Sequence, residues 1–178
     1  MSALWADWRL EFMAAHPTLF RIAADEPQLS FGYPLCKVGW RAILDRLCDR
    51  IEDALRESET FEFVRIRQKL GILRADWDGG ISDATRIRIV QAVDLAVARS
   101  ACSCEICGTE GRLYAHHGCL STSCADHAVG SAVDVKAGLE NIRLYRRLPG
   151  KSDMYRARYD RETDTLTELP SSAAGPEE

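Results

Sequence analysis

The sequence predicts a mixed α+β fold: three helices, a β-hairpin, a small cysteine-rich unit of the treble-clef or ribbon type, and a C-terminal hairpin. Three observations lead to this fold class. In three segments apolar residues recur every three or four positions, which is typical of amphipathic helices. In a fourth segment apolar residues alternate with arginines, which is typical of a strand. Two Cys/His pairs frame a fifth segment, and each pair has two residues between its members.

The first two helices are predicted from the spacing of their apolar residues. Residues 4–15 are expected to form a short helix that ends before Pro17, since the residue before a proline avoids the α region. A second helix is expected from about Val38 to Glu57. One face of it is acidic, and we expect that face to be a solvated surface. It consists of Asp45, Asp49, Glu52, Asp53 and Glu57.

The third helix is expected to begin near Ser82 and to end near Arg99. Ser82 is a favourable N-cap, and Asp83 places a negative charge in the first turn. The apolar face is broad, so this helix is expected to be the central buried one. That face consists of Ile87, Val90, Val93, Ala96 and Val97.

Two β-hairpins are predicted. The first covers residues 61–77 with Gly71 at the turn, and its alternation places Val64 and Ile66 on the same face. The second is the C-terminal hairpin, with strands over residues 154–159 and 165–169.

The 178 residues are expected to divide into a core over 1–100, a zinc-binding unit over 101–130 packed on that core, and a C-terminal extension over 131–170. Residues 171–178 are small, acidic and rich in Pro and Gly, so we expect a disordered tail. The formal net charge of −4 gives no global positive field that would draw the protein to nucleic acid or to an anionic membrane.

The N-terminal residues are expected not to form a secretory signal, because Trp5, Asp7, Trp8 and Arg9 stand where an apolar segment would be needed. No apolar run reaches the roughly 20 residues that span a bilayer. We therefore expect a cytoplasmic protein without a membrane partner. In that compartment seven cysteines indicate metal binding or buried thiols rather than disulfides.

A metal site is the clearest chemical feature of the sequence. Cys104 and Cys107 form a knuckle whose thiolates face one point, and Cys124 and His127 are three apart, so they share one face of a helical turn. The spacing predicts one structural zinc ion in a closed site that does not activate water. Four rival ligands stay open, of which Cys119 is expected to be a core residue of the hairpin. They are Cys102, Cys119, His116 and His117.

The predicted metal site is one of several short motifs that follow one another along the chain. The motifs are His16-Pro17-Thr18-Leu19-Phe20, Val38-Gly39-Trp40, residues 68–74, residues 77–80, residues 103–108 and residues 122–127. In this order, over about residues 16–128, the chain resembles a group of small uncharacterised bacterial and phage-encoded proteins. The resemblance implies zinc binding and carries no activity. The chain departs from the group at Cys119, where a tryptophan is usual.

The function that the sequence favours is a non-enzymatic, zinc-stabilised protein-binding module, such as an immunity or antitoxin protein or a phage-encoded inhibitor. Arginines and tyrosines, which are enriched at interface hot spots, are frequent between Tyr114 and Tyr159. We predict that Arg147 and Tyr155 contact the protein partner. The acidic net charge suits a basic partner such as a nuclease toxin.

Two alternatives stay open. One is a degenerate nuclease of the His-Asn-His type, because His116 and His117 follow the knuckle; however, the segment before Cys124 is short and Asn141 comes late for such a site. The other is nucleic-acid binding through basic strips with interleaved tyrosines. These strips are Arg65, Arg67, Lys69 and Arg74, and the arginines between Arg143 and Arg158.

Overall fold

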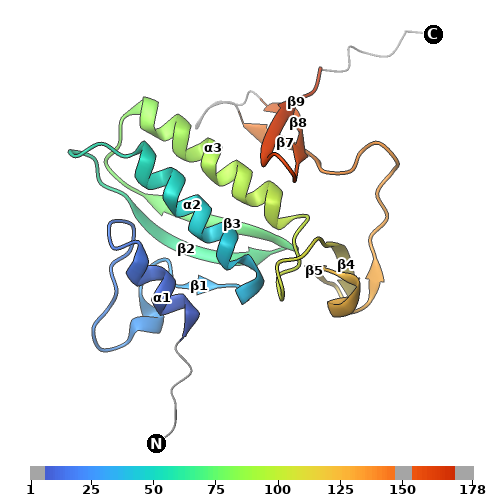
Figure 1. Ribbon diagram of the computed structural model, residues 1–178, viewed down its shortest axis with the longest axis horizontal. Helices are drawn as coiled ribbons and strands as arrows, with labels where there is room; N and C mark the ends of the chain where they lie inside the picture. The colour runs from blue at the N-terminus through green and yellow to red at the C-terminus, as the bar shows by residue number, and fades with distance from the viewer. Residues whose placement is uncertain (1–6, 147–153, 171–178) are drawn as a thin grey trace, which may run out of the picture.

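The computed structural model describes residues 7–146 and 154–170, and within these ranges it contains three α-helices and three small sheets (Figure 1). The predicted fold class is therefore confirmed. The start of the first predicted helix, the tail 171–178 and Arg147 lie outside the described residues. No helix of the described part is long and apolar enough to cross a membrane.

The first sheet contains β1 (Pro34–Leu35), β2 (Glu62–Lys69) and β3 (Ile72–Asp78), in that order. β1 is parallel to β2, whereas β2 and β3 form the predicted antiparallel hairpin. Leu70 and Gly71, both with positive φ, form its turn. One face of this sheet packs against the helices, and the opposite face points away from them.

The helices α2 (Arg41–Ala54) and α3 (Asp83–Ser100) lie side by side over one face of this sheet (Figure 1). α1 (Trp8–Ala15) lies near β1 and contributes Phe12 and Met13 to the same core. A 3₁₀ turn, η2 (Val38–Trp40), precedes α2, and another, η1 (Pro27–Leu29), lies in the loop before β1. The main core is buried between the helices and the sheet. Its fully buried members include Phe12, Met13, Leu19, Trp40, Leu44, Leu47, Ile51, Phe63, Ile66, Leu73 and Ile89.

The prediction of which residues share one face of the hairpin is wrong. Val64 and Ile66 were expected on the same side, but Ile66 is fully buried and Val64 is 44% exposed. The register shifts between Phe63 and Arg65, so β2 contains a bulge. The extra residue interrupts the alternation, and as a result Phe63 and Ile66 face the core instead.

The predicted face of the third helix is also displaced. The helix itself is confirmed, with the Ser82 side chain accepting the Thr85 backbone N–H. However, Ile87, Val90, Val93 and Val97 are only half-buried. The buried stripe contains smaller side chains, which let α3 approach α2 closely. It consists of Thr85, Ile89, Ala92 and Ala96.

The C-terminal part forms a sheet of β7 (Ile142–Arg146), β8 (Met154–Asp160) and β9 (Thr165–Glu168), in that order. The predicted hairpin of β8 and β9 is confirmed, and β7 adds a strand that was not predicted. This sheet packs on the end of α3 through a second, smaller apolar cluster. The cluster consists of Ala98, Cys102, Tyr145, Ala157 and Tyr159.

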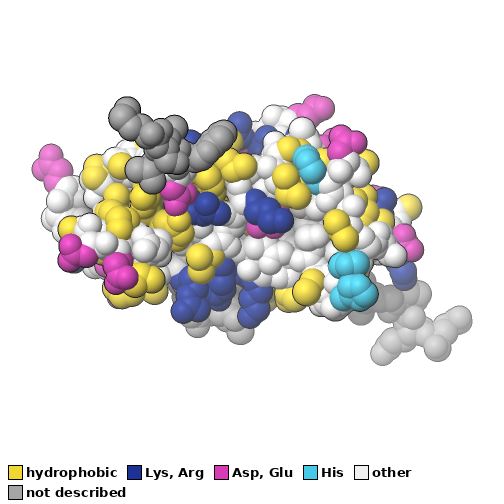
Figure 2. Space-filling view, turned by 90° about the horizontal axis from the view of Figure 1, so that it is seen from below, with side chains coloured by type: hydrophobic (Ala, Val, Ile, Leu, Met, Phe, Trp, Pro, Cys, Tyr) yellow, Lys and Arg dark blue, Asp and Glu magenta, His cyan; other side chains and the backbone are white. Residues whose placement is uncertain are grey.

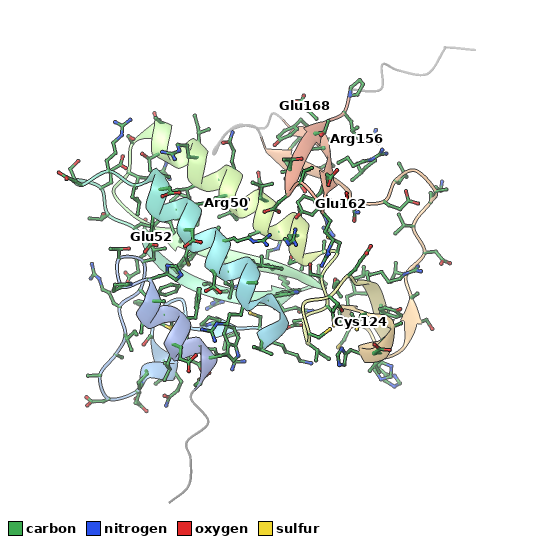
Figure 3. All side chains as sticks on the ribbon, viewed as in Figure 1. Arg50, Glu52, Cys124, Arg156, Glu162 and Glu168 are labelled. Carbon is green, nitrogen blue, oxygen red and sulfur yellow. The ribbon has the colours of Figure 1, made fainter. Side chains whose placement is uncertain are left out.

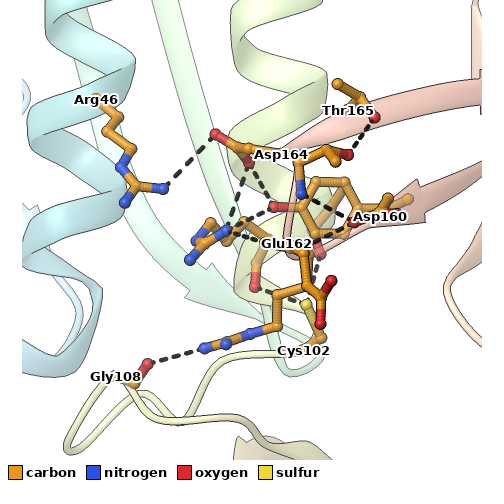
Figure 4. Close-up of polar contacts among 12 residues, drawn as sticks. Arg46, Cys102, Gly108, Asp160, Glu162, Asp164 and Thr165 are labelled. Carbon is orange, nitrogen blue, oxygen red and sulfur yellow. Dashed lines mark hydrogen bonds and ion pairs between the residues drawn. The ribbon is translucent and has the colours of Figure 1, made fainter.

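A charge cluster ties the same sheet to α2 (Figure 4). Asp164, in the turn before β9, accepts a hydrogen bond from Arg50 at 2.7 Å and another from the Tyr159 hydroxyl. Arg46 and Arg99 each approach the Asp164 carboxylate to 3.7 Å. One carboxylate therefore holds guanidinium groups from both long helices.

Candidate metal centre

Four side chains of the cysteine-rich unit come together at one point: Cys104, Cys107, Cys124 and His127. Their Sγ and Nδ1 or Nε2 atoms all lie within 4.8 Å of one another, so they can hold a metal ion. Cys107 Sγ is 3.7 Å from Cys124 Sγ, and His127 Nδ1 is 3.2 Å from Cys124 Sγ and 3.7 Å from Cys104 Sγ. The structure thus brings together the four residues that the sequence predicted as ligands.

Three local elements position these ligands. The knuckle over residues 104–107 carries the first two cysteines, and Gly108 follows it with a positive φ of 78°. β4 (Arg112–His116) and β5 (Cys119–Ser123) form a hairpin, to which β6 (Ser131–Ala132) adds a short strand. Cys124 is then the N-cap of the 3₁₀ turn η3 (Ala125–His127), which turns His127 back toward the knuckle. The order of knuckle, hairpin and turn is that of a treble clef, with the usual helix reduced to one turn.

The surroundings favour thiolates at the exposed side of the centre. Hydrogen bonds from the Thr109 side chain and backbone lower the pKa of Cys107 to about 7. Burial opposes ionisation of Cys124, but hydrogen bonds from Thr109 and from the His127 backbone outweigh it and lower its pKa. Cys104 is buried, and burial raises the pKa of its thiol. A metal ion would supply the positive charge that this buried thiolate needs.

The knuckle is joined directly to the core. The Gly39 N–H donates to Glu105 O at 2.9 Å, and the Trp40 indole N–H donates to Ser103 O at 2.9 Å. A Cβ on Gly39 would lie 2.5 Å from Cys104 O, so only glycine permits this approach. The motif Val38-Gly39-Trp40 therefore has a structural role, because it holds the knuckle against the core.

The four rival ligands do not join the cluster. Cys102 is buried in the turn that follows α3, where its thiol donates to Arg99 O at 3.4 Å. His116 and His117 are exposed at the tip of the hairpin, with ring centroids 4.1 Å apart. Cys119 was expected in the core of the hairpin and is exposed instead. That expectation is wrong because Cys119 is the first residue of β5 and pairs with His116 beside the exposed turn of the hairpin, whereas the buried residues of β5 are Thr122 and Ser123 at its other end.

Sequence reasoning missed a second group of possible ligand atoms, formed by His16, Asp49 and Glu52. His16 is buried, and its Nδ1 lies 3.0 Å from Glu52 Oε2, while Thr18 donates to Glu52 Oε1 at 2.7 Å. These bonds tie the His16-Pro17-Thr18 segment to α2. Glu52 belonged to the acidic face that was expected to be solvated. That expectation holds for Asp49, Asp53 and Glu57, whereas Asp45 and Glu52 are partly buried. Figure 3 shows Glu52 on α2 and Cys124 in the metal unit, as two separate places.

Of the two predicted partner contacts, the structure describes Tyr155. It is half-buried on β8 and its ring lies 5.8 Å from that of Tyr145, centroid to centroid. Part of the Tyr155 side chain therefore packs against the C-terminal apolar cluster, and only the rest is exposed to solvent.

No family model matches the chain, and neither the curated proteins nor the solved structures gave a match. The case for function therefore depends on the side chains themselves.

Proposed function

We propose that the protein is a zinc-stabilised, non-enzymatic binding module that docks a protein partner on the face of its first sheet that no helix among the described residues covers. Zinc is the metal that suits the centre best. Metal–sulfur bonds of about 2.3 Å in a tetrahedron require sulfur–sulfur distances of about 3.8 Å. The distance between Cys107 Sγ and Cys124 Sγ is 3.7 Å.

A Cys₃His set fills all four positions of a tetrahedral zinc ion. Such an ion stabilises a fold and leaves no position for a water nucleophile or a substrate. The role we give to the zinc is therefore to hold the hairpin of β4 and β5 against the core. Gln68 on β2 donates to Leu120 O at 2.6 Å, and Thr122 donates to Gly71 O at 2.6 Å, so the metal unit also supports the sheet.

The observation that carries the proposal is the character of the sheet face opposite α2 and α3. Basic side chains line it: Arg65 and Lys69 are exposed on β2, and Arg74 is exposed on β3. In cross-strand register, Arg67 faces Arg74 and Arg65 faces Asp76. Arg67 pairs with Asp76 at 2.9 Å. The face therefore has an excess of positive charge, although the chain as a whole has a net charge of −4.

Large apolar side chains lie beside this basic strip. Phe31 is 64% exposed, Leu35 on β1 is 61% exposed and Val64 is 44% exposed. The Gly32 N–H donates to Val64 O, and Leu35 faces Arg67 in register, so the apolar residues follow the β1 side of the sheet. Figure 2 shows Lys and Arg side chains gathered near the lower edge of the molecule in that view, with apolar surface to their left.

The net charge of the whole chain favoured a basic partner, but the local excess of positive charge on this face supports instead a protein partner with an acidic, partly apolar surface. Aromatic residues and arginines are enriched at the centres of protein interfaces, and exposed apolar patches mark binding sites. Single-stranded nucleic acid would call for several aromatic rings among the basic residues. Phe31 is the one aromatic ring among the three apolar residues named above, and the aliphatic side chains of Leu35 and Val64 provide no stacking surface.

A pull-down from native cells tests the proposal. Wild-type protein is compared with Leu35→Asn/Arg65→Glu, and Arg88→Glu on the exposed side of α3 is the charge-matched control. We expect a protein that is captured by wild type and by the control, that survives nuclease treatment, and that the double variant loses. If nuclease treatment removes every captured partner, the protein-binding proposal is wrong and nucleic-acid binding takes its place.

The enzyme alternative has its own test. A nuclease assay with added divalent cations is expected to show no cleavage by wild type. Cleavage that disappears in His116→Ala or His117→Ala would contradict the non-enzymatic proposal.

A further inference from the structure

A pocket of ≈ 340 Å³ lies between β3, α3 and β7, away from the metal centre. Ile72, Val93 and Val97 contribute apolar surface to it. Its polar lining includes Arg74 from β3, Asp94 from α3, and Arg143 and Tyr145 from β7. The volume is at the lower end of the range of small-molecule sites, about 300–1,000 Å³.

The Tyr145 hydroxyl has no hydrogen-bond partner among the described residues, although the side chain is only 5% exposed. A buried hydroxyl without a partner costs roughly 1–3 kcal/mol, so native proteins seldom keep one without a reason. Burial raises the pKa of Tyr145 to about 12, with opposing influences from Arg143 and Asp94. Both charged groups therefore act on this hydroxyl.

The two charges are themselves uncompensated. Among the described residues, neither Arg143 nor Asp94 forms an ion pair with a protein group. Burial raises the pKa of Asp94 to about 6, and no neighbouring cation offsets that effect. Burial lowers the pKa of Arg143, and repulsion by Arg74 adds to the decrease. Arg74 and Arg143 are thus two cations near each other, while Asp94 is an anion paired with neither.

We propose that this pocket binds a small zwitterion of the free amino acid class. The ligand carboxylate lies between the Arg74 and Arg143 guanidinium groups, and the ligand ammonium group donates to Asp94. The Tyr145 hydroxyl donates to the carboxylate and so gains the partner that the protein does not provide. Such a ligand compensates both signs of charge at once, which neither an inorganic anion nor a simple amine can do. The pocket borders the open face of the sheet at Arg74 and Asp76. The residues that test it, Arg143, Asp94 and Tyr145, take no part in the proposed docking.

Isothermal titration calorimetry on the zinc-loaded full chain tests the proposal with the free L-amino acids, added one at a time. For each acid that binds, the N-acetyl derivative and the carboxamide serve as probes that lack one charge. We expect at least one free acid to bind, and each derivative to bind about tenfold more weakly or worse, because a charge-assisted hydrogen bond contributes about 1.5–3 kcal/mol.

Three variants separate the roles of the residues. Arg143→Gln, Asp94→Asn and Tyr145→Phe are each expected to weaken binding about tenfold, since one charged or polar partner is lost while the side-chain shape is nearly kept. Arg88→Gln, on the exposed side of α3, is the control that retains wild-type affinity. Circular dichroism confirms that each variant is folded. The proposal is overturned if no free amino acid binds, or if the N-acetyl derivative or Asp94→Asn leaves the affinity unchanged.

Discussion

Gly39 shows how a single missing side chain determines where the metal unit sits. Around its Cα are three backbone atoms of the knuckle: Cys104 O, Glu105 O and Gly108 N would lie 2.5, 2.6 and 2.6 Å from an added Cβ. All three belong to backbone that is held by its own hydrogen bonds, so none can move aside without breaking the knuckle.

Gly39→Ala is therefore expected to lower the free energy of unfolding by about 1–3 kcal/mol, as overpacking of a buried contact does. Urea unfolding of the zinc-loaded protein measures the effect. Gly80→Ala is the matched control, because the nearest atom to its Cβ would be the Thr60 hydroxyl at 3.2 Å. Equal unfolding midpoints for the two variants would show that the close contact at Gly39 is absent in solution.

Asp94 gives a prediction for pH. Burial raises its pKa from 3.8 to about 6, so the folded state holds this proton more tightly than the unfolded state. Ionisation in the folded protein therefore lowers stability progressively as the pH rises from about 4 to about 6. Asp94→Asn is expected to be more stable than wild type by about 1 kcal/mol near pH 8, after allowance for partial exposure, and by less near pH 5.

Chemical unfolding at both pH values, without added amino acids, checks this prediction. Asp53→Asn, on the exposed side of α2, is expected to give no such pH-dependent gain. A constant difference between Asp94→Asn and wild type would mean that Asp94 is not desolvated in the folded protein.

At the residue scale, the four side chains that could hold a metal ion were predictable from the sequence because their geometry is local. Two residues between the members of each pair are enough to bring both ligand atoms to one side of a tight turn. The pocket groups could not be predicted in this way. Asp94 and Arg143 come from distant segments, and only the packing of β7 on α3 removes them from water together.

At the scale of elements, the C-terminal sheet depends on Asp164. Burial opposes ionisation of this carboxyl, but hydrogen bonds from Tyr159 and Arg50 and the charges of Arg50 and Arg99 outweigh it, so its pKa is lowered. The sheet shares only a small apolar cluster with α3. We infer that the charge cluster around Asp164 fixes how this sheet lies on the two long helices.

Asp164→Asn is expected to lower the free energy of unfolding by about 1–3 kcal/mol, because hydrogen-bonded charges are lost while arginines remain. Asparagine tolerates the positive φ of 53° at this position, so the backbone itself is not strained by the change. Since the folded pKa is depressed, the contribution of Asp164 is present near neutral pH and is lost as the pH falls below the unfolded value.

Hydrogen exchange of the β8 and β9 amides provides the measurement, and Asp126→Asn in the exposed turn η3 provides the control. In Asp164→Asn, but not in the control, we expect amide exchange in β8 and β9 to become faster than in wild type, while exchange in α2 stays unchanged. If the β8 and β9 amides exchange at wild-type rates in both variants, the apolar cluster alone is enough to hold the sheet.

The elements themselves were largely predictable, but their orientation was not. The Ser82 cap, the turn at Gly71 and the limits of β8 and β9 follow from local sequence. The bulge in β2 and the buried stripe of α3 do not. α3 is apolar around much of its circumference, so the side that faces the core is selected by how closely α2 can approach, and small residues such as Ala92 and Ala96 allow the closest approach.

At the scale of the whole molecule, we expect metal binding and folding to be coupled. Cys107→Ser removes one ligand from the proposed zinc site. Structural zinc contributes about 10–16 kcal/mol of apparent binding energy, so the variant is expected to lose the metal and to unfold at least residues 100–130. Cys119→Ser changes an exposed thiol of the same unit and is expected to retain one zinc ion per chain.

Elemental analysis together with circular dichroism measures both outcomes. Full zinc content in purified Cys107→Ser would contradict the ligand assignment. Loss of zinc in Cys119→Ser would likewise indicate that Cys119 is a ligand in solution.

The hydrogen bond between Trp40 and Ser103 also has a consequence for synthesis on the ribosome. The two residues are 63 positions apart, and the indole is fully buried in the finished protein. At about 5–20 residues per second, a ribosome delivers the acceptor roughly 3–13 seconds after the donor. During that interval the indole N–H of Trp40 has no acceptor, although the residues of the main core, which end at Ala96, have already been made. The core is therefore synthesised before the knuckle that docks on it, and this buried donor is satisfied only when the knuckle has emerged from the exit tunnel.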